Sequence, residues 1–239
     1  MFYFLLPTLV SYNFFLIAAA VVPAVFLMVK TYRSDKLEKE STSMLWNLTK
    51  AGVFSSLIAL VEERVLCFVL DRTVSKESFI YNIILYFGIV AFAEESSKYL
   101  MLKRRSWHSR EFNCQYDGVI YAVFVSLGFA LWENISYVMA YGAGTAIVRA
   151  VTAIPGHACF GVFMGVFYGT AKKLERRGHA GASEFLRVLS VVIPALIHGA
   201  YDYIATSQTS ALYFTCFIAV LFVVSYILVS RTSKKDSYI

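Results

Sequence analysis

Residues 79–102, FIYNIILYFGIVAFAEESSKYLML, form an apolar stretch of membrane-spanning length that carries Glu94, Glu95 and Lys98 in its second half. A charged side chain near the centre of a bilayer costs roughly 2.5–3.5 kcal/mol on insertion scales, so an acid pair there indicates a functional site. Two adjacent carboxylates at low dielectric do not both carry charge easily, which suits one of them to proton transfer. The simpler alternative is that Lys98 neutralises both acids on one helix face.

The rest of the chain is also too apolar for a soluble protein. Of its 239 residues 58% are hydrophobic and 16% charged, with a mean hydropathy of +0.61, whereas soluble domains are about half apolar and a quarter charged. Stretches long enough to cross a hydrocarbon core roughly 30 Å thick occupy residues 3–29, 47–70, 79–102, 117–141, 147–171, 185–205 and 211–229. No linker or internal repeat separates them. The sequence therefore predicts an all-α, polytopic transmembrane bundle of seven helices that forms one domain, residues 1–239.

The positions of Lys and Arg predict how this bundle lies in the lipid bilayer. The first, third and fifth connections and the C-terminal tail are rich in these residues, whereas the opposite connections carry only Arg72, Lys76 and Arg149. The positive-inside rule then places the N-terminus outside and the C-terminus in the cytoplasm. The net charge of +6 is explained by this orientation, so we expect no nucleic-acid partner.

Four further polar residues lie inside predicted helices. Glu133 shares a helix face with Phe129, and His198 and Asp202 are four residues apart, which directs both side chains to one point. His157 follows a Pro-Gly pair in the fifth stretch. Together with Glu94 and Glu95, these residues predict one shared cavity, because one site explains the polar residues of all four helices, whereas otherwise each would need a separate structural explanation.

The chemistry of this cavity stays open at this stage. His157, His198, Glu133 and Asp202 would supply ligands for zinc if a metal is bound. The same residues would equally serve a metal-free site in which a glutamate activates water. Buried Glu and His also make the proton relays of membrane transporters, so a proton-coupled transporter is the alternative function, and a non-enzymatic scaffold is a third.

Estimated depths agree only partly with a shared site. Measured along upright helices, Glu133, His157 and His198 lie roughly 10–15 Å below the outer face and Asp202 about 5 Å below it. Glu95 lies deeper, at about 18–24 Å. A tilted or broken helix would be needed to bring Glu95 to the others.

Three other features have simpler explanations. Glu62, Glu63 and Arg64 are expected to pair with one another at the outer interface, and Arg149 to meet lipid headgroups or a substrate carbonyl. Gly161, Gly165 and Gly169 recur every fourth residue, a spacing typical of close helix packing.

The polar residues fall in short motifs with a defined order. These are Tyr32-Arg33-x-Asp35-Lys36-x-Glu38, Glu94-Glu95-x-x-Lys98, Asp117-Gly118, Phe129-x-x-x-Glu133-Asn134, Arg149-Ala150, Pro155-Gly156-His157-Ala158-x-x-Gly161 and His198-Gly-x-Tyr-Asp202. In these motifs the chain resembles the PrsW family of bacterial and archaeal intramembrane proteases, which is related to the CAAX prenyl endopeptidases. The segment after Glu38 lacks the proline often found there, which affects the expected shape of the first loop only.

The resemblance implies a multi-pass peptidase of the plasma membrane that cleaves a single-pass membrane protein, typically an anti-sigma factor in envelope stress. It implies that Glu94 and Glu95 are the essential acids, and we favour Glu95 as the base. Glu133, His157, His198 and Asp202 would complete the site, supported by Lys98, Asn134 and Arg149. Family members have been described as metalloproteases and as glutamic-type enzymes, so zinc is one of two options.

Overall fold

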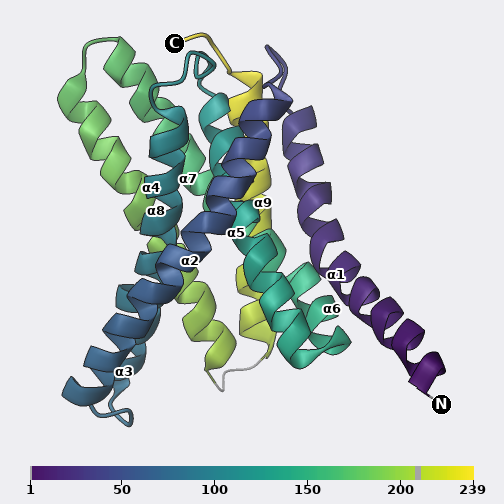
Figure 1. Ribbon diagram of the computed structural model, residues 1–239. Coiled ribbons are helices and arrows are strands. Elements are labelled where there is room, and N and C mark those ends of the chain that lie inside the picture. Colours follow the sequence, from purple (N-terminus) through teal and green to yellow (C-terminus); the bar gives the residue numbers. More distant parts are fainter. Residues whose placement is uncertain (1, 208–210) are drawn as a thin grey trace.

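Helices account for nearly all of residues 2–207 and 211–239, the residues that this computed structural model describes (Figure 1). They are α1 (Phe2–Arg33), α2 (Thr42–Thr73), α3 (Phe79–Ile83), the π-helical η1 (Ile84–Val90), α4 (Ala91–Ser106), α5 (Asp117–Tyr141), α6 (Ala143–Val151), α7 (Ala153–Arg176), α8 (Ala180–Thr206) and α9 (Ala211–Lys234). In this part of the chain, the one β-bridge joins Cys114 to Tyr238.

Each of the seven predicted stretches is helical, which confirms the all-α bundle. α3, η1 and α4 follow one another without a gap, and only Thr152 separates α6 from α7. Among the described residues, six of these helical segments are long and apolar enough to cross a membrane. The exception, α2, is as long as α1 and runs from one end of the bundle to the other (Figure 1). Several helices extend beyond the predicted bounds because the helical backbone continues into their polar ends.

Helix α5 forms the centre of the bundle and packs against α1, α2 and α7. In its membrane-spanning window 78% of the residues are buried, compared with 11% in α9, which lies at the periphery. Glycines allow the backbones of α5 and α7 to touch, since a Cβ at Gly165 would lie 2.5 Å from the carbonyl oxygen of Gly118. Gly161 and Gly169 face the same helix, so the glycine stripe serves helix packing, as predicted.

A buried polar network joins the connections at one end of the bundle. We call this end, where residues 34–41, 107–116 and the C-terminus lie (Figure 1), the basic end. The Tyr121 hydroxyl donates to Glu40 at 2.6 Å, and Asp117 accepts the backbone N–H groups of Asn113 at 3.0 Å and Cys114 at 2.6 Å. Burial raises the pKa of Glu40 from 4.5 to about 7. The network fixes α2 and α5 at the end opposite the cavity described below.

We expect Glu40→Gln to raise the midpoint temperature of unfolding at about pH 8 and to leave it nearly unchanged at about pH 5. The folded protein holds a proton on Glu40 that the unfolded chain releases above pH 4.5, so wild-type stability falls as the pH rises towards about 7. Glutamine removes this loss because it cannot ionise. Thermal unfolding at both pH values tests the prediction, with the exposed Glu38→Gln as control. An equal change at the two pH values would contradict it.

Candidate active site

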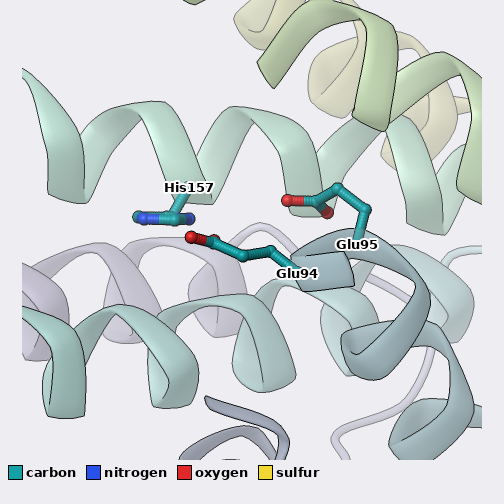
Figure 2. Close-up of side chains that lie close together, drawn as sticks. All are labelled: Glu94, Glu95 and His157. Atoms are coloured by element: carbon teal, nitrogen blue, oxygen red, sulfur yellow. The ribbon is translucent and has the colours of Figure 1, made fainter. Parts of the chain in front are cut away.

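A cavity of about 480 Å³ lies between α2, η1, α4, α5, α6, α7 and α8. Its charged and imidazole side chains are Glu63, Glu94, Glu133, Arg149, His157, His198 and Asp202. Figure 2 shows the Glu94 carboxylate extending from α4 towards the His157 imidazole on α7, with Glu95 beside it. Residues from four predicted helices that are distant in sequence therefore meet in one place.

Lys98 lies at the centre of this cluster and is fully buried. Its ammonium Nζ is 2.7 Å from Glu95 Oε1, 3.2 Å from Glu94 Oε2 and 3.1 Å from His157 Nδ1. It also lies 4.0 Å from the centre of the Phe129 ring. Lys98 thus pairs with both acids on one helix face, as the simpler alternative proposed, and at the same time links them to a histidine on another helix.

His157 connects Lys98 to a second charged chain. Because an ammonium can only donate, the Nδ1 atom of His157 accepts from Lys98 and its Nε2 atom carries the proton. Nε2 then donates to Glu133 Oε2 at 2.8 Å. Arg149 pairs with the same oxygen at 3.1 Å and donates through Nε to Asn134 at 2.9 Å. These contacts fix the position of the Glu133 side chain and orient the imidazole.

His198 lies between two carboxyl groups. Its Nδ1 atom is 3.0 Å from Glu95 Oε1, and its Nε2 atom is 3.5 Å from Asp202 Oδ2. The Phe160 ring stacks on the imidazole at 4.5 Å between centroids. Glu95 therefore reaches His198, although its estimated depth was too great. That estimate assumed upright helices, whereas the helices are tilted (Figure 1) and the π-helical η1 precedes α4.

The two adjacent acids differ in their access to the cavity. Glu94 lines it, whereas Glu95 has no exposed surface and is held between Lys98 and His198. Lys98 also lies behind the residues that line the cavity. Asn134 is buried, and its amide group donates to the carbonyl of Ala20 in α1. The other predicted site residues all face the cavity.

Glu63 was missed as a cavity residue in the sequence. We expected it to pair with Glu62 and Arg64 at the interface, but it lines the cavity with Ser56 and Leu60. The spacing of these three residues, one and two helical turns apart, places them on one face of α2. That pattern was visible in the sequence, but nothing there showed that this face of α2 meets the cavity.

One group of side chains has the geometry to hold a metal ion within the described part of the chain. Glu94, Glu95 and His157 each offer a ligand atom, and these atoms lie within 4.8 Å of one another. Carboxylate and imidazole are ordinary zinc ligands, and Glu95 Oε2 is buried without a hydrogen-bond partner, so the residues fit zinc. Of the four predicted ligands only His157 belongs to this group. An ion held here would share its three side chains with Lys98.

Comparison with known proteins gives one consistent family. Residues 40–229 match the sequence profile described as PrsW family intramembrane metalloprotease. Protease PrsW of Bacillus subtilis (strain 168) is 31% identical over 202 residues, which cover 84% of this chain and 87% of that protein. Protease PrsW of Halalkalibacterium halodurans is 33% identical over 190 residues, with 79% and 82% covered. No solved structure matches this chain.

Proposed function

Because this chain belongs to the PrsW family of intramembrane metalloproteases, and is therefore a multi-pass membrane peptidase, we propose that it hydrolyses a peptide bond of a single-pass membrane protein in the cavity between α2, α4, α5, α7 and α8. The observation that supports this site is the cluster of Glu94, Glu95, Lys98, His157 and His198, which three helices bring together. Family membership favours proteolysis over the proton-coupled transporter.

Glu94, Glu95, Lys98 and Arg149 each have a proposed task. Glu94 is the buried acid with access to the cavity, so it is the group that takes a proton from the attacking water. Glu95 and Lys98 fix each other and orient His198 through Glu95 Oε1. Arg149, which faces the cavity beside Glu133, can donate to the developing oxyanion of the scissile carbonyl.

Zinc is the metal that we propose for this metalloprotease. Glu94, Glu95 and His157 would hold it, and a bound zinc ion supplies Lewis acidity and a water of lowered pKa. Glu133 would orient His157 through Nε2, as carboxylates do for metal-bound histidines. Glu94 is then needed either as a ligand or as the base.

The finer proposal concerns the substrate and its setting. We propose an anti-sigma factor-like single-pass protein, cleaved in a bacterial or archaeal plasma membrane during envelope stress. Its support is the family resemblance alone. The acidic and imidazole-rich lining of the cavity suits a peptide backbone, whose N–H groups would find carboxylate acceptors in Glu63 and Asp202.

The test is cleavage of single-pass membrane proteins, including anti-sigma factors, by the purified protein in liposomes. We expect the wild type to cut one of them within or beside its apolar segment, located by mass spectrometry. We expect His198→Ala to cut it at least about 100-fold more slowly, whereas His179→Ala, an exposed histidine of the α7–α8 connection, cuts it normally. Unchanged cleavage by His198→Ala would contradict the site, and pH-driven solute flux without any cleavage would favour transport.

A further inference from the structure

The four carboxyl groups that face the cavity differ in whether the chain supplies them with a cation. They belong to Glu63, Glu94, Glu133 and Asp202. Three have a basic partner, at 3.2, 3.1 and 3.5 Å respectively, namely Lys98 for Glu94, Arg149 for Glu133 and His198 for Asp202. Within the described part of the chain, the Glu63 carboxylate has no ion-pair or hydrogen-bond partner. A cation that pairs with Glu63 is therefore expected from a bound molecule.

The neighbours of Glu63 on α2 do not neutralise it. Arg64 is exposed and follows Glu63 directly, so the two side chains leave the helix about 100° apart and do not face each other. Leu60, one turn before Glu63, lines the cavity on the same face of α2. A carboxylate beside an apolar side chain suits a lysine or an arginine, which packs its carbon stem on apolar surface and keeps its charged head on a polar group.

The position of Glu63 leaves it open to a bound molecule. Its side chain is partly exposed and faces the cavity from α2, whereas the acid pair faces it from α4. Both α2 and α8 begin at the basic end and run away from it (Figure 1). Glu63 lies in the second half of α2, and Asp202 lies one turn before the end of α8. A cationic side chain can therefore approach Glu63 without passing the basic end.

We propose that Glu63 determines specificity by accepting the ammonium or guanidinium group of a substrate lysine or arginine beside the scissile bond, an inference that rests on the proposed proteolysis. Charged groups inside an apolar bundle normally pair with one another, and a cation from the substrate completes the pairs of this cavity. Glu63 is outside the group that can hold a metal ion, and a single carboxylate supplies too few ligands for one. An acidic substrate residue would meet only like charge at Glu63, so charge acts for one class of sequence and against the other.

Charge exchange between enzyme and substrate tests this role. The membrane-embedded probe is the single-pass protein that the wild type cleaves in liposomes, with each residue beside the scissile bond replaced in turn by lysine or by glutamate. At one of these positions we expect the wild type to show a kcat/KM about tenfold higher for the lysine probe, the lower end of what a hydrogen bond between charged groups contributes. Glu63→Gln should reduce this ratio, and Glu63→Lys should reverse it.

The matched control is the neighbouring acid Glu62, which is exposed on α2 and does not line the cavity. Glu62→Lys should keep the wild-type ratio. A variant that is merely less stable lowers both rates and leaves their ratio unchanged, so the ratio separates specificity from structure. Equal ratios in the wild type and Glu63→Lys, or an equal reversal in Glu62→Lys, would overturn the inference while leaving the proposed proteolysis intact.

Binding decides the role of Glu63 if the wild type cleaves no single-pass protein and the proposed function fails. The probe is then a fluorescent apolar peptide with one central lysine, compared with the same peptide carrying glutamate, and fluorescence anisotropy with the detergent-solubilised protein measures both affinities. Tighter binding of the lysine peptide by the wild type, reversed in Glu63→Lys, would support Glu63 as the cation acceptor of the cavity. Equal binding of the two peptides would overturn it.

Discussion

Glu94→Gln is expected to lower kcat for peptide-bond cleavage by about 10²–10⁴-fold, the range that proton transfer by a positioned acid or base contributes. Glu94 is the member of the acid pair that lines the cavity, and glutamine keeps its shape but cannot accept a proton. The folded state should survive, because Lys98 keeps its shorter contact, 2.7 Å, with Glu95. Single-turnover cleavage of the membrane-embedded probe measures the effect.

The control for this variant is Glu62→Gln, an exposed acid on α2. Zinc content separates the two tasks that Glu94 can have. Loss of bound zinc together with activity would identify a ligand, whereas loss of activity with zinc retained would identify the base. Retention of full activity by Glu94→Gln would contradict both tasks. Glu95, which we favoured from the sequence, would then be the candidate for the base.

Glu95→Gln should behave differently from Glu94→Gln although the residues are neighbours. Glu95 Oε1 lies within hydrogen-bond distance of both Lys98 and His198, and glutamine keeps an acceptor oxygen but removes the negative charge that these partners on α4 and α8 meet. We therefore describe Glu95 as a positioning residue, and expect its substitution to reduce stability as well as activity.

The helices could be predicted from the sequence because the hydropathy and the length of a membrane-spanning stretch are properties of that stretch alone. The predicted stretch 117–141 coincides with α5, and the polar residues expected to meet do so. The rotation of each helix about its axis could not be predicted, because it depends on packing between helices. For that reason the sequence did not show that Glu94 rather than Glu95 lines the cavity, or that Glu63 joins it.

Lys98 illustrates the same limit more sharply. Its spacing from Glu94 and Glu95 predicted the two ion pairs, since all three lie on one helix. Its third contact, with His157 Nδ1, joins residues 59 positions apart and depends on how α4 meets α7. Only the structure shows that the ammonium touches all three side chains that could hold a metal ion.

Lys98→Met is therefore expected to lower the free energy of unfolding by about 3–5 kcal/mol in zinc-free protein, the loss typical of breaking a buried ion pair. Methionine has a similar volume but leaves Glu95, which has no exposed surface, beside Glu94 without the ammonium that contacts both. The exposed Lys50→Met on α2 is the control, and it should unfold like the wild type. An unchanged midpoint of unfolding in Lys98→Met would show that the stability of the folded protein does not depend on the pairing of the two acids with the ammonium.

Zinc should restore the stability of Lys98→Met and do so more strongly than it stabilises the wild type. An ion bound by Glu94, Glu95 and His157 replaces the missing positive charge, and in the variant it no longer shares these three side chains with the ammonium. Ligand binding stabilises the folded state by RT ln(1 + [L]/Kd), so the tighter site shows the larger rise in unfolding temperature at equal zinc. An equal rise in both proteins would place the metal away from Lys98, because only an ion that shares its contacts gains from its removal.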